Sequence, residues 1–227
     1  GKAKFDIIAV LPDITGGYGA LEHQPAVLYN AMIAPLIPLS IQGVIWYQGE
    51  SNADNKADAV EYNKLFPAMI NDWRRRWGQG EFPFLFVQLS SFGALQSHPA
   101  DANWRYLHKS QSGTLTLPNT GMAITTDIGN PSNIHPVQKR EVGDRLAAEA
   151  MRVVYGKPGL PSTGPIFSNY KIQGNQVILE FKNTGKGLLA KNGPLKHFAV
   201  AGADKKFYWA DAVIKGKQVI VTCKDVK

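Results

Sequence analysis

The chain has 227 residues, 44% of them hydrophobic and 10% aromatic, which suits either one large globular domain or a medium domain followed by a small one. Pro35, Pro38 and Gly43 interrupt the most hydrophobic stretch, so no apolar run reaches the roughly 18 to 20 residues that a membrane span needs. The net charge of +7 comes from scattered lysines and arginines, and the densest run, residues 74–76, closes a helical pattern, so we expect neither a membrane span nor a nucleic-acid partner.

The first thirty residues are rich in glycine, proline and turn formers, and only residues 5–11 have the pattern of a strand. Neither an initiator methionine nor a signal-peptide pattern is present there, so we expect this end to be cut from a longer protein. Residues 27–37 then have an apolar helical pattern. Residues 43–47 form a short apolar run that is typical of a buried parallel strand.

A long helix is predicted over residues 58–77, where Gly78 is placed to end it and Pro67 predicts a kink. Its expected apolar face consists of Val60, Leu65, Phe66, Met69, Ile70, Trp73 and Trp77. Strands at 84–89 and 121–126, a helix at 102–115 and a helix from about Pro136 to Val154 continue the pattern. This alternation of strands and helices predicts an α/β fold with a parallel sheet.

Residues 155–165 break all periodicity and predict a linker. Beyond them, period-two alternation predicts a small antiparallel β unit with strands at residues 176–181, 197–200, 207–209 and 218–222. The lone cysteine, Cys223, excludes an internal disulfide and is interpreted as a core residue of a strand. We therefore predict an α/β domain over residues 1–157 and a small β-rich domain, which we expect to be incomplete, over residues 158–227.

Ligands of parallel α/β sheets bind beyond the carboxyl ends of the strands, so the polar residues after each buried run are candidates for a site. The run that ends at Tyr47 opens into amide, carboxylate and hydroxyl groups, those of Gln48, Glu50, Ser51 and Asn52, with Gly49 among them. In one interpretation, Ser51 or Asn52 caps the next helix and Glu50 is solvated. In the other, Gln48 and neighbouring backbone N–H groups donate hydrogen bonds to the negative oxygen of an acyl-transfer intermediate.

A second cluster, residues 127–136, follows the third predicted strand and contains Asp127 and His135. Histidine suits proton transfer near neutral pH, and Asp127 is close enough in sequence to orient His135 if the loop folds back. The alternative is a histidine of a surface loop. On the helix at 102–115, Arg105 is either part of a solvated face or a partner of Glu50. No histidine or cysteine has the spacing of a zinc site, so we predict no metal.

Several motifs, all in one order, resemble the sialate O-acetylesterase family over about residues 25–156. They are residues 28–36, 43–52, 61–67, 72–74, 82–89 and 127–136, of which Gln-Gly-Glu-Ser-Asn at 48–52 is the most distinctive. The resemblance implies a flavodoxin-like SGNH-hydrolase fold with three layers, present here in part. It also implies a periplasmic or secreted serine esterase that removes acetyl groups from sugars or sialic acid without a cofactor. Carried over by position, His135 would be the general base and Gln48 an oxyanion contributor, with Gly49, Glu50 and Asn52 beside it.

The nucleophile is the main departure from this pattern. Such hydrolases take their serine from a Gly-x-Ser block on the first strand, and this chain has no such block, so we expect the serine upstream of residue 1. Ser51 is the alternative, since it follows a strand and precedes a helix, although it lacks the second glycine of a nucleophile elbow. Many SGNH hydrolases have aspartate three residues before the histidine, where this chain has Ser132. Asp127 or a backbone carbonyl would then orient His135. A carbohydrate-binding or accessory module without catalysis is the alternative function.

Overall fold

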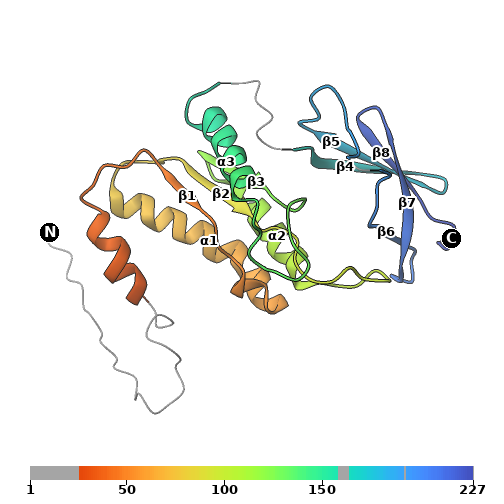
Figure 1. Ribbon diagram of the computed structural model, residues 1–227, viewed down its shortest axis with the longest axis horizontal. Coiled ribbons are helices and arrows are strands. Elements are labelled where there is room, and N and C mark those ends of the chain that lie inside the picture. The colour runs from red at the N-terminus through yellow and green to blue at the C-terminus, as the bar shows by residue number, and fades with distance from the viewer. Residues whose placement is uncertain (1–25, 158–163, 192, 227) are drawn as a thin grey trace, which may run out of the picture.

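A computed structural model of the chain describes residues 26–157, 164–191 and 193–226. Its first part alternates three strands with three helices, namely β1 (Val44–Trp46), α1 (Lys56–Trp77), β2 (Phe84–Gln88), α2 (Asn103–Gly113), β3 (Thr120–Ile124) and α3 (Lys139–Val153). The strands pair in parallel in the order β1-β2-β3. The predicted parallel α/β sheet is confirmed (Figure 1). The predicted strand at 5–11 and much of the predicted linker lie outside the described residues.

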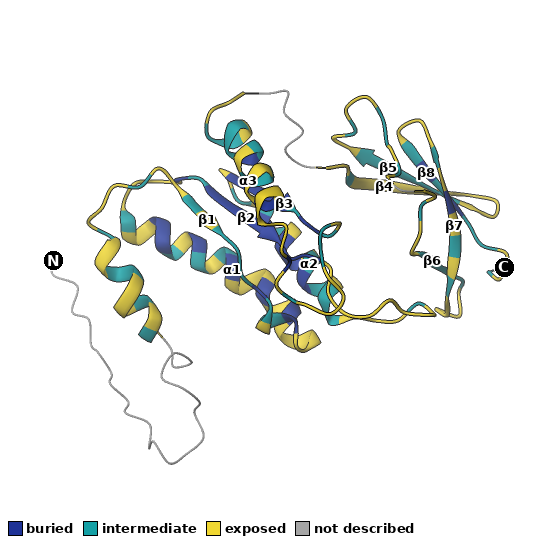
Figure 2. Cartoon of the chain, viewed as in Figure 1, coloured by how far each residue is buried: buried dark blue, intermediate teal, exposed yellow. Residues whose placement is uncertain are grey.

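The sheet is the middle of three layers. On one face, the aromatic core joins it to α1, where the Phe66 ring lies 5.1 Å from Phe86 and 5.9 Å from Phe84 between centroids. On the other face, Gly121 of β3 lies against α3, where an added Cβ would come within 3.1 Å of Val153. Figure 2 shows that buried residues concentrate in β2 and in the sides of the helices that face the sheet.

Helix α1 begins and ends where its sequence signals it. The Asn55 side chain accepts a hydrogen bond from the Asp58 N–H, and Gly78 ends the helix with a left-handed φ of 65°. The three arginines lie in the last turn, as predicted, and the helix runs through Pro67. Val60 and Leu65 are a correction: they are 49% and 53% exposed and do not belong to the buried face.

Two other predicted helices differ from expectation. Residues 27–37 are helical but irregular, with a π-helical turn (η2, Tyr29–Ile33) followed by a 3-10 turn (η3, Ala34–Leu36) that contains Pro35. Helix α3 begins at Lys139 and not at Pro136, because the residues before it are held as a loop. The Asn133 side chain accepts the His135 N–H, and Gln138 has a non-helical ψ of 59°.

β1 is an outer strand in the described part of the chain, where it pairs with β2 alone. Its Ile45 is in register with the buried Leu85 but is itself 69% exposed, because α3 packs mainly on β2 and β3. Several apolar residues just before β1 are exposed as well, namely Leu28, Met32, Leu36 and Leu39. This side of the fold therefore presents an unpaired strand edge with apolar side chains around it.

The C-terminal part is an antiparallel sheet of five strands in the order β4-β5-β8-β7-β6, beside the α/β part in Figure 1. The strands are β4 (Ile166–Gln173), β5 (Gln176–Lys182), β6 (Phe198–Ala201), β7 (Phe207–Lys215) and β8 (Gln218–Thr222). The antiparallel β unit is confirmed, but β4 was not predicted, because a bulge between Phe167 and Asn169 breaks its alternation. Cys223 is also a correction: it is only half-buried and follows the end of β8.

Candidate active site

The carboxyl ends of β1, β2 and β3 lie at one edge of the sheet, because both strand pairs are parallel. Three loops leave this edge, residues 47–50 after β1, residues 89–102 after β2 and residues 125–138 after β3. The predicted site residues belong to the first and third loops and to the turn that follows the first. They therefore start from the same side of the fold (Figure 1).

A chain of hydroxyl groups joins the three loops at this edge. The Tyr47 hydroxyl lies 3.4 Å from Ser90 Oγ, and Ser90 Oγ lies 2.9 Å from Thr125 Oγ1. Thr125 Oγ1 in turn donates to the Gln88 carbonyl at 2.6 Å. Ser90 and Thr125 are buried, so water competes little for these bonds. The loop of Gln48 and the loop of His135 are thus tied together through the end of β2.

The loop of His135 has three further contacts with its neighbours. Ser91 Oγ donates to the Thr126 carbonyl at 2.6 Å, and the Gly93 N–H donates to the Pro131 carbonyl at 3.2 Å. Directly after the loop, Nζ of Lys139, the first residue of α3, lies 5.0 Å from the centre of the Tyr47 ring. The loop is therefore anchored both on the β2 loop and beside the residue that precedes Gln48.

The Gln48 side chain is held at both of its amide atoms. Its Nε2 donates to Asn52 Oδ1 at 2.9 Å, and its Oε1 accepts a hydrogen bond from the Tyr62 hydroxyl at 3.1 Å. Asn52 belongs to a 3-10 turn (η4, Ser51–Ala53) and Tyr62 to α1, so two rigid elements fix the amide. A fixed amide suits an oxyanion donor, which must be oriented before charge develops.

Gly49 and Glu50 shape the same loop. Gly49 is buried with φ of 143°, and a Cβ added there would lie 3.2 Å from the side chain of Leu107, so only glycine fits. The Gly49 N–H donates to Glu50 Oε2 at 2.9 Å. In this conformation the N–H is therefore directed at the Glu50 carboxylate, which is not merely solvated.

The alternative interpretation of this loop as a helix cap by Ser51 or Asn52 is wrong. The residue that caps α1 is Asn55, whose Oδ1 accepts the Asp58 N–H at 2.9 Å. Asn52 instead holds Gln48, as described above. The polar groups after β1 are thus turned toward one another, and their pattern is not explained by helix capping.

His135 is exposed, and its imidazole makes no hydrogen bond within the described residues. Its backbone N–H donates to Asn133 Oδ1 at 2.9 Å, and Asn130 Oδ1 accepts the Ser132 N–H in the same loop. The loop is therefore stabilised by its own asparagine side chains, while the imidazole is left accessible for proton transfer.

Asp127 is engaged by an arginine of α3. Arg145 donates to Asp127 Oδ1 at 2.5 Å and to Oδ2 at 2.7 Å, and its Nη1 also donates to the Ile124 carbonyl. The Arg145 guanidinium holds the pKa of the Asp127 carboxyl below its ordinary value. Asp127 is therefore ionised at neutral pH, and its carboxylate faces Arg145 in this structure.

We expect Arg145→Met to destabilise the natural protein in a pH-dependent way. Because the folded-state pKa of Asp127 is lowered, the pair stabilises the fold above the unfolded-state pKa of about 3.9 and loses this effect as pH falls through the lowered value. The thermal unfolding midpoint should drop at neutral pH, and part of the drop should vanish below about pH 4.

Arg140→Met is the matched control, since the Arg140–Asp144 pair is 3.8 Å long and largely exposed. It should change the unfolding midpoint little at any pH. A drop for Arg145→Met that is the same at all pH values would show that the Asp127 pair does not titrate as inferred.

Helix α2 makes contacts at the strand ends that the sequence did not predict for its residues. The buried Gln111 donates through Nε2 to the Val87 carbonyl at 3.2 Å and accepts the Leu89 N–H through Oε1 at 3.1 Å. The Trp104 indole N–H donates to the Ser90 carbonyl at 2.8 Å. The recurrence of Leu107, Gln111 and Thr114 on one helical face is the signal in the sequence that Gln111 is buried.

The proposed pair between Arg105 and Glu50 is a correction. Arg105 donates to Asp101 at 2.6 Å and to the Tyr106 hydroxyl at 2.7 Å, on the exposed side of α2. His108, on the same helix, lies 2.8 Å from the Leu89 carbonyl through Nε2, and burial lowers its pKa. It is thus a neutral packing residue at the end of β2.

The C-terminal sheet touches the edge of the candidate site through the β2 loop. The Trp209 indole N–H donates to the Ser97 carbonyl at 3.0 Å.

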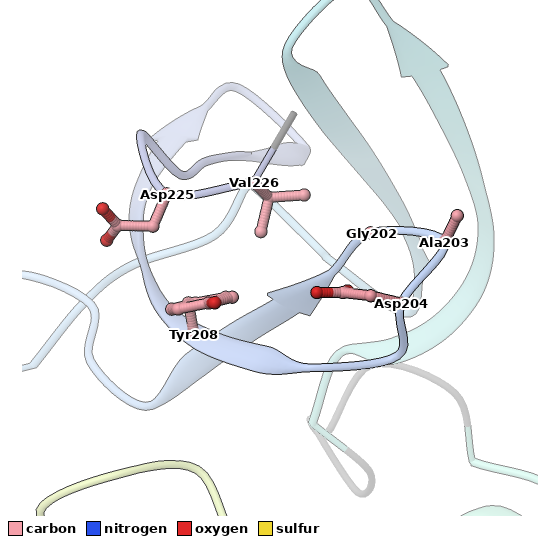
Figure 3. A pocket seen from close by; sticks show the side chains of 6 residues that line it. All are labelled: Gly202, Ala203, Asp204, Tyr208, Asp225 and Val226. Atoms are coloured by element: carbon pink, nitrogen blue, oxygen red, sulfur yellow. The ribbon is translucent and has the colours of Figure 1, made fainter.

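A hollow in the C-terminal sheet, between Asp204, Tyr208 and Asp225, contains none of the predicted site residues (Figure 3). In the described part of the chain, no group of three or more His, Cys, Asp or Glu side chains is arranged to hold a metal ion. No helix within the described ranges is both long and apolar enough to cross a membrane.

Comparisons with known proteins agree with this arrangement. Residues 2–152 match the family described as carbohydrate esterase, sialic acid-specific acetylesterase. The sialate O-acetylesterase of Mus musculus is 37% identical over 171 residues, covering 68% of this chain and 31% of that protein, and the human one is 36% identical over the same length. A crystal structure of a carbohydrate acetylesterase from Xanthomonas citri superposes with a TM-score of 0.84 and 44% identity, covering 92% of this chain and 48% of that one.

The family match covers well over half of the chain, and it includes the loops of both Gln48 and His135. The predicted α/β fold of SGNH type agrees with the solved structure from Xanthomonas citri. The chain spans about a third of the length of the curated relatives that it matches. The chain belongs to the sialic acid-specific acetylesterase family of carbohydrate esterases.

Proposed function

We propose that the natural protein containing this chain is a serine-dependent carbohydrate O-acetylesterase that acts on acetylated sugars, sialic acid among them. The observation that carries this proposal is the hydrogen-bonded link from Tyr47 through Ser90 to Thr125, which brings the loops of Gln48 and His135 to one sheet edge. The names of the relatives, sialate O-acetylesterases and a carbohydrate acetylesterase, support the same substrate class.

In this mechanism, His135 takes the proton of a serine hydroxyl as the serine oxygen attacks the acetyl carbonyl carbon. The carbonyl oxygen becomes negative and accepts a hydrogen bond from the Gln48 amide. His135 then gives its proton to the departing sugar oxygen, and a water molecule repeats the cycle to release acetate and regenerate the serine. Neither a metal nor an organic cofactor is needed for these steps.

The nucleophilic serine is proposed to lie upstream of residue 1 in the natural protein. The chain matches only 31% of the mouse relative's length, and the open edge of β1, with Ile45 exposed, provides a place where further strands can pair. Ser51, the alternative, is exposed on a 3-10 turn and has no hydrogen bond to His135 within the described residues. It therefore lacks the base contact that activates a serine.

The orienting group for His135 is proposed to be Asp127 or a backbone carbonyl. Asp127 is ionised and belongs to the same loop, but both of its oxygens accept hydrogen bonds from Arg145. As an orienting residue it would have to share its carboxylate between Arg145 and the imidazole. An activity assay of the Arg145→Met variant tests whether the Asp127 carboxylate, once released from Arg145, serves the His135 imidazole.

A periplasmic or secreted location is proposed from the family and its sugar substrates. The division into an α/β domain over 1–157 and a β-rich domain over 158–227 is likewise a proposal, because the boundary adjoins residues outside the described ranges. The β-rich part makes its own core, with Val219 and Val221 buried, which supports treating it as a separate unit.

The test is acetate release by the natural protein from O-acetylated sialic acid and from acetylated neutral sugars. Turnover of at least one substrate supports the proposal, and the relative kcat/KM values identify the preferred sugar. The 227-residue chain by itself should hydrolyse aryl acetates negligibly. Binding of acetylated sugars by the natural protein without any turnover would favour a binding module, and robust turnover by the chain alone that Ser51→Ala abolishes would make Ser51 the nucleophile.

A further inference from the structure

One of the two N–H groups of the Gln48 side-chain amide is available to a ligand. An amide nitrogen carries two hydrogens, and one of those on Gln48 Nε2 is donated to Asn52 Oδ1 at 2.9 Å. Among the described residues, the second hydrogen has no acceptor. Oε1 is turned away by its bond to the Tyr62 hydroxyl, so the amide cannot exchange its two ends without breaking this bond. The free N–H is therefore directed by Tyr62 on one side and by Asn52 on the other.

Tyr62 is suited to this task because it is rigid and remains protonated. Its side chain is only 4% exposed and packs on Phe66 at 5.1 Å between ring centroids. Burial, with a smaller contribution from the Glu50 charge, raises the pKa of Tyr62 to about 12. Its hydroxyl thus stays a donor over the whole pH range in which an imidazole can act as a base. The same hydroxyl lies 3.4 Å from the Gln48 carbonyl, so its one hydrogen is shared between the side-chain and backbone oxygens of residue 48, with the side-chain oxygen the nearer.

We propose that Tyr62 is a positioning residue for acetyl-ester hydrolysis, which orients the Gln48 amide so that its remaining N–H faces the acetyl oxygen. This inference rests on the proposed function, in which Gln48 stabilises the oxyanion. Removal of one oxyanion donor costs about 100- to 1,000-fold in kcat, and a displacement of about 1 Å costs about 100-fold. Loss of the Tyr62 hydroxyl releases Gln48 without removing it, so its effect is smaller than that of Gln48→Ala.

The experiment compares Tyr62→Phe, Gln48→Ala and the double variant in the natural protein. Tyr62→Phe should lower kcat by about 10- to 100-fold with little change in KM, since a misplaced oxyanion donor affects the transition state more than substrate binding. The double variant should be no slower than Gln48→Ala, because Tyr62 has nothing left to orient.

Ser110→Ala is the matched structural control. Ser110 is also buried between α1 and α2, and its hydroxyl donates to the Ala59 carbonyl at 2.7 Å without touching Gln48. The unfolding midpoint of the Ser110→Ala variant should fall, while its kcat stays at the wild-type value. Normal kcat for Tyr62→Phe beside a slow Gln48→Ala, or multiplicative losses in the double variant, would overturn the positioning role alone. Normal kcat for Gln48→Ala would remove the oxyanion assignment on which it rests.

Discussion

Replacing His135 with alanine in the natural protein should lower kcat for acetyl-ester hydrolysis by about 10,000-fold or more. Without the imidazole, the serine hydroxyl keeps its proton and the sugar leaves as a poorly stabilised alkoxide, so only binding and the oxyanion donors still accelerate the reaction. His135 is exposed and buries little surface, so the unfolding midpoint should barely change. Steady-state kinetics on an aryl acetate and on an acetylated sugar measure the loss.

His197→Ala provides the control for this experiment. His197 is also exposed, but it lies just before β6 in the C-terminal part, where its ring centroid is 5.8 Å from that of Trp209. Its kcat should remain within a few-fold of the wild type. A near-normal rate for His135→Ala would remove this residue from the mechanism and return it to the role of a surface-loop histidine.

The second large effect is expected at Gly129, in the loop between Asp127 and His135. A Cβ added at Gly129 would lie 2.0 Å from the Ser91 carbonyl oxygen, closer than any non-bonded contact allows. One of the two backbones must therefore move by about 1 Å, and kcat should fall by about 100-fold or more, because the loop that carries His135 moves with it. The unfolding midpoint should also fall.

Gly143→Ala is the same chemical change at a place where space is open. Beyond the adjoining residues and backbone of α3, no atom lies within 4 Å of the added Cβ, and alanine is favoured over glycine within a helix by about 0.5 to 1 kcal/mol. This variant should be as active as the wild type and slightly more stable. A fully active Gly129→Ala protein would show that the loop can retreat from Ser91 without displacing the imidazole.

The parts of the fold that local patterns encode were predictable from the sequence. Phe84 to Val87 form an unbroken apolar run because both faces of β2 are covered by helices, and Gly78 marks the end of α1 because it takes a left-handed φ. β4 was missed because its bulge shifts the alternation by one residue at Phe167. The start of α3 was placed too early, since the bond between Asn133 and the His135 backbone depends on a loop conformation that a helix signal at Pro136 does not contain.

The candidate site was likewise only partly predictable from the sequence. Gln48 and His135 could be proposed from the sequence because each follows the pattern of an apolar strand and belongs to a family motif. The contacts of Gln111 and Tyr62 and the link between Ser90 and Thr125 could not be, because they join residues at least 14 positions apart. An ion pair between Arg105 and Glu50 looked reasonable by charge alone, but Asp101 lies one helical turn from Arg105 and takes its guanidinium.

The parallel order of the sheet also affects how the protein folds. Val44 of β1 pairs with Phe84, forty positions later, and Phe84 pairs with Thr120, so each pairing closes a long loop that contains an entire helix. Helical structure can therefore appear early in refolding, while the three loops gather only when the last pairing closes. In the natural protein, recovery of acetyl-ester hydrolysis should lag behind recovery of helical content, because a partly folded chain can have its helices before the three loops have come together.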